Sequence, residues 1–387
     1  VSPDFRNLEN NILSLDFGYF QRLAGEVRPF FAEGRGFFNT GYDANTFASQ
    51  RVRQFDAGVR VFGNADDRTK FGFMALQDTG DQSVIVSSVT RTPTPRTTFQ
   101  LSHVRSSEKD SSNDAVRFFA QQGQGAFNYW TNVQGSKDSK KGAGARWDFG
   151  ASQDLPTGSI YMSVANVERD YYPRLGNQFE TDYQGLNVGT WRFSRPKKGP
   201  VFETNWNING NYYWRKNGLP YRREANGNAN LTLRSGWAAG INASTSRFEQ
   251  FDDRLVGAYL SYPNNDPVWG VSVDVTKGDL SGKNYRSAGA SFSYRPSPKL
   301  QASASVQWVS HFERGRQAIL TGSYDLGNNV FVSARAVQFD NDQSAYFSLR
   351  KSGATGNDYY LIFGDPNARR FTRSIAFKAV FPLNIKL

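Results

Sequence analysis

The sequence predicts an all-β fold, a transmembrane antiparallel β-barrel of roughly 22 strands, with about 20 as the alternative count. Two observations carry this prediction. Segments of about ten residues, in which apolar and polar residues alternate, recur along the chain between turn-forming residues. Aromatic residues make up 15% of the chain, although its mean hydropathy is only −0.59. A polar lumen combined with aromatic girdles at the lipid boundary produces this composition.

The C-terminal stretch 371–387 shows the alternation most clearly. Every odd-numbered position from Ile375 onward is apolar: Ile375, Phe377, Ala379, Phe381, Leu383, Ile385 and Leu387. Among the even positions, Ser374, Lys378, Asn384 and Lys386 are polar, whereas Ala376, Val380 and Pro382 are exceptions. A period of two gives an extended strand one apolar face and one polar face. The stretch is therefore predicted to be the strand that closes the barrel.

The same alternation defines strands upstream. Apolar residues occupy Ala288, Ala290, Phe292 and Tyr294, and after Pro296 and Pro298 the pattern resumes at Leu300, Ala302, Ala304, Val306 and Trp308. Small or polar residues such as Ser291 and Ser303 fall between them. We expect the apolar set to face lipid and the small set to face the lumen.

The connections fall into two alternating sets. One set is short or rich in Pro and Gly: 64–68, 93–96, 122–125, 154–158, 196–200, 235–236, 263–267, 296–298, 327–328 and 353–356. The other is generally longer and more charged: 106–113, 169–182, 215–223, 249–254, 277–283, 340–343 and 365–370. Outer-membrane barrels have short periplasmic turns and longer external loops, which predicts the orientation. An upward strand must then precede the strand at Phe55–Gly63, and Ile12–Phe20 is the candidate.

Composition excludes several classes of protein. No run approaches 18 apolar residues, so a transmembrane helix is not expected. The chain has no Cys, which excludes disulfides and thiolate chemistry. The net charge is +11, which fits an anion-favouring lumen, contact with lipid phosphates, or basic residues scattered over loops and wall. The basic residues form no dense patch, so we expect no nucleic-acid partner. Because the chain begins at Val1, we expect that a leader preceded it.

Residues 1–40 differ from the remainder of the chain. They contain Pro3-Asp4-Phe5 with Glu9, and then a block of Glu26, Arg28-Pro29-Phe30-Phe31 and Glu33-Gly34. Over these forty residues the chain resembles the DUF5916 family of bacterial envelope proteins. Ser49-Gln50-Arg51-Val52 stands where the family has a Ser-Arg-Arg-Ile-Gly-like element.

The resemblance implies the C-terminal outer-membrane barrel of such a protein, without the N-terminal carbohydrate-binding-module-like domain that family members carry. We divide the chain into a junction segment, residues 1–40, and a barrel, residues 41–387. The junction segment is expected to supply a first strand and to contribute a plug, or else to be a strand end with its loop.

Tyr and Trp lie near many predicted strand ends. We expect an aromatic girdle at the two lipid interfaces, where such rings are stable, formed by Tyr129, Trp130, Trp147, Trp191, Trp214, Trp237, Trp269 and Tyr359. A sugar-stacking platform is the alternative for the clusters around Tyr171 and Tyr212.

The sequence contains no recognisable catalytic or metal-binding constellation. His103 and His311 are the only histidines and lie far apart. The acidic pairs at 66–67, 252–253 and 340–342 lack the spacing of a calcium loop. No nucleophile elbow, phosphate loop or dinucleotide fingerprint is present. We therefore predict no enzyme, no cofactor and no metal.

The leading functional prediction is a porin-like channel or transport component that passes a solute or polymer through a basic lumen. Its candidate lumen and plug residues are Arg28, Phe30, Phe31, Glu33, Arg60, Arg146 and Arg335. The alternative is a plugged scaffold that holds a partner protein in the outer membrane. Expected partners are membrane lipids and lipopolysaccharide, and other outer-membrane or periplasmic proteins.

Overall fold

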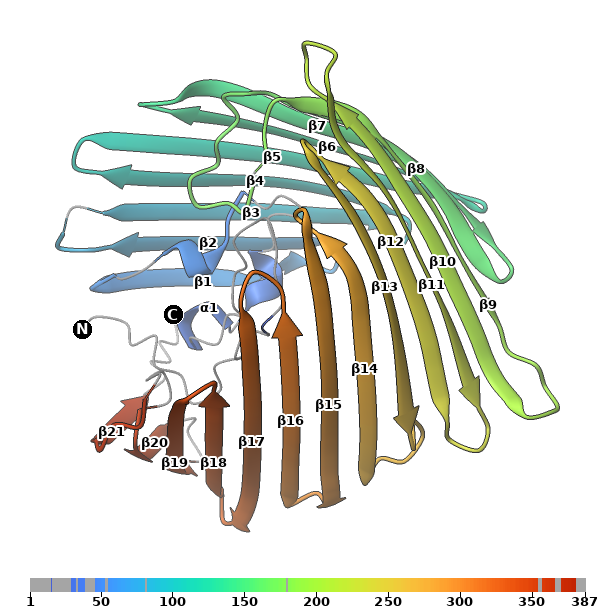
Figure 1. Cartoon of the computed structure of the whole chain (residues 1–387). Coiled ribbons are helices and arrows are strands. Elements are labelled where there is room, and N and C mark those ends of the chain that lie inside the picture. Colours follow the sequence, from blue (N-terminus) through green and yellow to red (C-terminus); the bar gives the residue numbers. More distant parts are fainter. Residues whose placement is uncertain are drawn as a thin grey trace.

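A computed structural model describes residues 15, 29–32, 34–38, 46–52, 55–80, 82–178, 180–353, 357–365 and 370–380. In this part of the chain, 21 strands form one antiparallel sheet that curves around an interior (Figure 1). Each strand pairs with the next one along the chain, from β1–β2 to β20–β21. The predicted all-β antiparallel barrel is confirmed.

The strand bounds are β1 Ala57–Asp66, β2 Thr69–Gln77, β3 Ser83–Thr94, β4 Thr97–Glu108, β5 Ser111–Gln124, β6 Phe127–Asp138, β7 Gly142–Leu155, β8 Gly158–Val167, β9 Tyr183–Ser194, β10 Val201–Trp214, β11 Pro220–Leu233, β12 Ala238–Phe248, β13 Phe251–Tyr262, β14 Trp269–Leu280, β15 Lys283–Ser297, β16 Leu300–Ser310, β17 Arg314–Gly327, β18 Val330–Phe339, β19 Asp342–Ser352, β20 Asp358–Phe363 and β21 Ile375–Val380. Among the described residues, three short helices precede the sheet: α1 Pro29–Ala32, η1 Arg35–Phe37 and η2 Ser49–Arg51.

The two ends of the barrel differ in their connections. At one end, which we call the turn end, β17 and β18 are joined through Asn328 and Asn329, both with positive φ, as two-residue hairpins require. At the other, the loop end, residues 168–182 join β8 to β9 and residues 364–374 join β20 to β21. Elsewhere at the loop end the strands continue into residues that the sequence pattern assigned to loops. For example, only residues 109–110 separate β4 from β5, because the rest of the predicted loop 106–113 belongs to these two strands.

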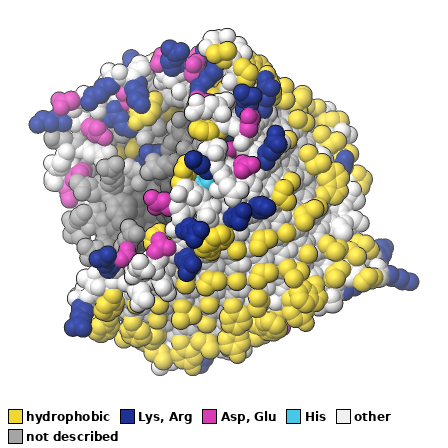
Figure 2. Space-filling model, in the orientation of Figure 1, with side chains coloured by type: hydrophobic (Ala, Val, Ile, Leu, Met, Phe, Trp, Pro, Cys, Tyr) yellow, Lys and Arg dark blue, Asp and Glu magenta, His cyan; other side chains and the backbone are white. Residues whose placement is uncertain are grey.

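The outward face of the sheet is apolar. Met162 is 59% exposed, Ile241 64%, Val256 63% and Val306 55%, and each occupies the outward position of its strand. Figure 2 shows a broad band of hydrophobic side chains over the strands that face the viewer. Large apolar surface exposed to water is unfavourable, so this band is suited to lipid. The predicted outward set Phe292, Tyr294 and Val306 belongs to it.

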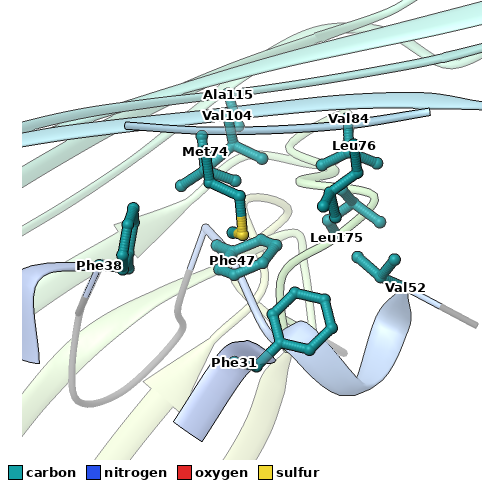
Figure 3. Close-up of a cluster of buried hydrophobic side chains, with 11 residues drawn as sticks. Phe31, Phe38, Phe47, Val52, Met74, Leu76, Val84, Val104, Ala115 and Leu175 are labelled. Carbon is teal, nitrogen blue, oxygen red and sulfur yellow. The ribbon is translucent and has the colours of Figure 1, made fainter. Parts of the chain in front are cut away.

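The inward face is covered by other segments near β2–β5. Phe31, Phe38, Phe47 and Val52 form one buried hydrophobic cluster with inward side chains of the wall and with Leu175 from the 168–182 loop (Figure 3). The wall contributes Met74, Leu76, Val84, Val86, Val104 and Ala115. The Ala48 backbone N–H donates to the Leu175 carbonyl at 2.6 Å, which joins the two covering segments. The described residues of 30–52 and of the 168–182 loop therefore meet inside the barrel.

The ends of the chain were assigned strands from the sequence. β21 provides the predicted final strand over Ile375–Val380, with Ile375 72% and Phe377 70% exposed; residues 381–387 lie outside the described part. The predicted first strand, 12–20, also lies outside it except for Leu15, whose N–H donates to Gln307 Oε1 at 2.9 Å. No helix among the described residues is both long enough and apolar enough to span a membrane.

Candidate functional site

An array of asparagines covers the inward face of β10 and β11. Asn205, Asn207, Asn209 and Asn211 alternate with outward Trp206, Ile208 and Tyr212, and Asn226, Asn228 and Asn230 stand opposite on β11. The Asn230 amide donates to Asn205 Oδ1 at 2.7 Å, and the Asn209 amide donates to Asn226 Oδ1 at 3.2 Å. Asparagine is depleted in ordinary strands, so period-two runs of it indicate a special inner surface. Each amide offers both donors and an acceptor without charge.

Paired charges lie on the inward face of β5–β7, and β8 and β9 separate them from this array. Arg117 donates to Asn132 Oδ1 at 2.8 Å and to Gln100 Oε1 at 2.6 Å, while the Asn132 amide donates to Asp148 Oδ2 at 3.0 Å. Arg146 Nε lies 3.4 Å from Asp148 Oδ2, within ion-pair distance. The positive charge on this wall is therefore held within a network that contains its own carboxylate.

A cavity of about 690 Å³ lies where the two networks meet. Its wall comes from β5–β11, and residues 177, 178 and 180 of the 168–182 loop line it as well. Arg146 Nη1 donates to Gln178 Oε1 at 2.6 Å. Glu180 accepts from the Tyr221 hydroxyl at 2.7 Å and pairs with Arg222 at 3.5 Å. The loop thus closes a hydrogen-bonding compartment against the inner wall.

Aromatic rings lie against inward glycines. The rings of Trp130 and Tyr161, which line the cavity, occupy the space that a Cβ would need at Gly150 and Gly189. The Tyr161 hydroxyl also donates to Asn209 Oδ1 at 2.7 Å. These glycines allow large rings to approach the backbone of the neighbouring strand. The compartment therefore combines amides, paired charges and aromatic surface.

The 168–182 loop is docked on the wall by its own polar contacts. Tyr171 is 1% exposed and its hydroxyl donates to Gln134 Oε1; burial raises the pKa of this phenol. The Tyr172 N–H donates to Ser136 Oγ at 2.7 Å. Arg174 Nη2 pairs with the buried Asp138 Oδ2 at 2.8 Å. The loop contains no strand among its described residues and folds into the barrel instead of extending away from it (Figure 1).

The structure places the predicted lumen and plug residues in separate regions. Phe30 packs against the cluster of Figure 3 and its carbonyl accepts from Arg60 Nη1. Phe31 is a buried member of that cluster. Arg146 lines the cavity, whereas Arg335 on β18 lies over the Tyr346 ring at 4.9 Å. Arg28 and Glu33 lie outside the described residues. The three wall arginines, on β1, β7 and β18, do not form one cluster.

Two of the eight predicted girdle residues face the lumen. Trp130 lines the cavity, and Trp191 shares its cross-strand row with inward Asn207. Both expectations were wrong for the same reason: in a period-two strand the side of the sheet, not nearness to its end, decides what a ring contacts. The other six lie on the outward side, namely Tyr129, Trp147, Trp214, Trp237, Trp269 and Tyr359. Trp237, Tyr262 and Trp269 form one aromatic group at the turn end, with ring centroids 4.6 and 5.9 Å apart.

The structure does not support the sugar-stacking alternative at Tyr171 and Tyr212. Tyr171 is buried beneath its loop, and Tyr212 faces outward, where its ring contacts Trp214. The rings that do line the cavity, on β6 and β8, were not singled out from the sequence for this role. The alternating runs NWNINGN (205–211) and NGNAN (226–230) were a visible signal of the inner asparagine array.

The histidines and acidic pairs serve local contacts. His103 Nε2 lies 3.1 Å from Asp114 Oδ1 on the wall, and the His311 ring contacts Phe312 in the β16–β17 turn. Asp253 accepts from the Ser281 N–H, Asp66 from the Arg68 N–H, and Asp342 from Arg370. The described residues contain no group of three or more side chains placed to hold a metal ion.

Comparison with known proteins gives no assignment by sequence. No family model matches the chain, and no curated protein matches it. Solved structures with similar strand arrangements include unliganded FecA, a ferric citrate transporter (8% identity, 79% of this chain and 61% of that chain, TM-score 0.37). They also include FyuA, the ferric yersiniabactin uptake receptor from Yersinia pestis (9% identity, 83% and 68%, TM-score 0.36). A structure described as "Asymmetric conductivity of engineered proteins" shares 11% identity over 68% of this chain and 98% of that chain (TM-score 0.36). At such scores the function must be argued from this chain's own residues.

Proposed function

We propose that this chain is an outer-membrane β-barrel that passes a polar solute through its lumen, with a non-enzymatic role. The observation that carries the proposal is the inner compartment, in which asparagine amides, paired charges and aromatic rings line about 690 Å³. Uncharged donors and acceptors replace the hydration of a hydroxyl- or amide-bearing molecule without trapping an ion. The solute class that fits is neutral and rich in hydroxyl or amide groups.

In place of a uniformly basic lumen, we propose a wall on which arginines are paired with carboxylates. Arg146 stands beside Asp148, and Arg222 stands beside Glu180 and Glu224. A solute therefore meets charge pairs on this part of the wall, and the path discriminates weakly between anions and cations. The net charge of +11 belongs to the whole chain, including its outer surface and turns.

The 168–182 loop acts as the gate of this path. It closes the compartment through Gln178 and Glu180 and is anchored through Tyr171 and Arg174. Loops that close a lumen must move to admit a solute, and polar anchors permit this more readily than a continuous apolar core. The described residues of 30–52 form the second cover, and they contact the wall through the buried hydrophobic cluster of Figure 3.

Single-channel conductance in a planar bilayer tests the proposal. The test compares the wild type, Arg174→Gln, and Arg169→Gln as a matched control in the same loop. Arg174 anchors the loop to buried Asp138, whereas the Arg169 side chain is 78% exposed and 3.5 Å from Asp182. We expect Arg174→Gln to open more often or conduct more, and Arg169→Gln to match the wild type. Equal traces for all three would contradict the gating role.

Solute class is tested by liposome swelling. Neutral polyols and disaccharides are compared with a carboxylate anion and a quaternary ammonium cation of similar size. We expect the neutral solutes to enter fastest, and the double variant Asn209→Leu/Asn228→Leu to slow their entry while the outward control Ile208→Leu does not. Faster entry of the anion would instead favour the basic lumen.

A plugged scaffold is the second candidate, and the buried cluster around Phe31, Phe38 and Phe47 favours it. In that case a folded, heat-modifiable barrel stays silent in the bilayer and impermeable in liposomes, and Arg174→Gln changes neither result. The covered lumen would then serve to hold a partner protein.

A further inference from the structure

The outward surface of β11–β15 carries a row of basic side chains at the loop end. Its members, which we call the cationic rim, are Arg223, Arg247, Arg254, Lys277 and Arg286. Each stands two residues from an outward apolar or small residue of the lipid-facing band, such as Val275 for Lys277 and Val256 for Arg254. Two residues advance a strand by about 6.6 Å on the same face. Figure 2 shows basic side chains along this edge, above the hydrophobic band.

Like charges oppose each other directly within the rim. Arg223 is the cross-strand partner of Arg247, and Lys277 is the cross-strand partner of Arg286. Side chains directly opposite on paired strands are close neighbours, and like charges there destabilise a sheet. Asp252 and Asp279 also belong to this outward surface, as cross-strand partners of Arg247 and Arg254, and Arg247 Nε lies 3.9 Å from Asp252 Oδ1. Five cations against two carboxylates leave the rim positive, so an anionic ligand would relieve the repulsion.

An apolar groove begins directly below the rim. It has a volume of about 810 Å³, and Ala225, Gly227, Ala243 and Val256 line it, with Arg254, Lys277 and Asp279 at its upper edge. The small side chains on β11 and β12 create the hollow between the larger Ile208 and Val256. A groove that is apolar along the barrel and cationic at one end matches an amphiphile with acyl chains and an anionic head.

We propose that the rim and groove form a binding site for a phosphorylated lipid. Its phosphate lies between Lys277, Arg286 and Arg254, and an acyl chain lies in the groove below. Arg and Lys form strong charge-assisted hydrogen bonds with phosphate oxygens, and acyl chains gain from contact with apolar wall. The site is on the outer surface, so it is independent of the transport path.

Lipid retention by the purified full chain tests this site. The protein is equilibrated in detergent with dioleoyl phosphatidic acid, with dioleoyl phosphatidylcholine, or with inorganic phosphate alone. Native mass spectrometry then counts the retained molecules. Wild type is compared with Lys277→Gln/Arg286→Gln and with Arg91→Gln/Arg192→Gln. The second variant removes the same charge from outward positions at the turn end, next to Phe99 and Trp206.

We expect the wild type and the turn-end control to retain phosphatidic acid, and the rim variant to retain it at least several-fold less. Equal retention by the rim variant would overturn the site. Equal retention of phosphatidylcholine would show an unspecific lipid shell, and equal binding of inorganic phosphate would show a free-anion site; either result overturns the proposal.

Lys277→Glu separates lipid binding from folding. It places a carboxylate opposite Arg286, so the cross-strand repulsion becomes an attraction. We expect a higher melting temperature than wild type in lipid-free detergent, together with loss of phosphatidic acid retention. A variant that melts no higher and still retains the lipid would contradict both the repulsion and the site.

Discussion

At the scale of single residues, glycine decides where the inner wall can carry aromatic surface. Trp130 lies over Gly150 on the adjacent strand, and Tyr161 lies over Gly189. A Cβ at either glycine would meet the ring, so the ring would have to leave its place on the wall. The rings and the glycines are therefore one structural feature, although they lie on different strands.

Gly150→Ala is expected to destabilise the barrel by about 1–3 kcal/mol, because the added methyl group overpacks the site beneath Trp130. Gly135→Ala is the matched control, since a Cβ there meets nothing within 4 Å. Thermal unfolding in detergent, followed by heat-modifiability on gels, measures both. If the two variants melt together, the Trp130 ring is not held in this position.

At the scale of elements, the 168–182 loop behaves as part of the barrel interior. Its anchor, Tyr171, has a raised phenol pKa because it is buried. A neutral phenol can donate to Gln134, whereas a phenolate cannot. Because the folded pKa lies above the usual value of 10.0, the docked loop keeps its full stability below pH 10. That stability is lost as the pH rises through the raised pKa.

Under the proposed gating role, the wild-type protein is therefore expected to conduct progressively more as the pH is raised above about 10, because ionisation of Tyr171 favours the undocked loop. Tyr171→Phe removes both the donor and the titration, and leaves Gln134 without this partner at a cost of about 1–3 kcal/mol. It should conduct more at neutral pH and lose the Tyr171-dependent alkaline step. Conductance between pH 7 and 11 distinguishes the two proteins; an unchanged alkaline step in the variant would assign it to another group.

At the scale of the whole molecule, one sheet separates three environments. Its outward face is suited to lipid, and its inward face carries the amide and charge-pair networks. Part of that inward face is covered by the described residues of 30–52 and of the 168–182 loop. The net positive charge is distributed among these surfaces. Under the proposed function, we expect selectivity to follow from the charges that face the path and not from the sum over the chain.

Arg146→Gln is expected to shift ion selectivity towards cations, because it leaves the Asp148 carboxylate on the cavity wall without its guanidinium neighbour. The reversal potential in a salt gradient measures the shift. Arg91→Gln, an outward substitution of the same charge, should leave the reversal potential unchanged. A cation shift as large in the control would mean that surface charge, not the compartment, sets selectivity.

Much of the fold was predictable because the alternation that marks a strand involves residues close together in the chain. The alternation at 287–308 and the turn at 296–298 predicted β15 and β16, and Ile375–Val380 lies within the predicted final strand. The compartment was less predictable. Arg146 is a predicted lumen residue, and its neighbour Asp148 lies two residues along the same strand. Gln178 and Tyr183, however, come from other parts of the chain and reach the same cavity only in the folded structure.

By itself, then, the sequence determined the period of two, the positions of most strands and turns, and the apolar band that a barrel turns outward, because these depend on neighbours in the chain. Tertiary structure decided which of two adjacent rings faces lipid: Tyr129 does, and Trp130 cannot, because neighbouring side chains leave opposite faces of a strand. It also decided that the charged 168–182 loop folds inward, where its side chains contact Gln134 and Asp138 on β6. Each of these contacts joins two residues that are far apart in the sequence, by 36 positions in one case and 37 in the other. Only the folded wall brings them together.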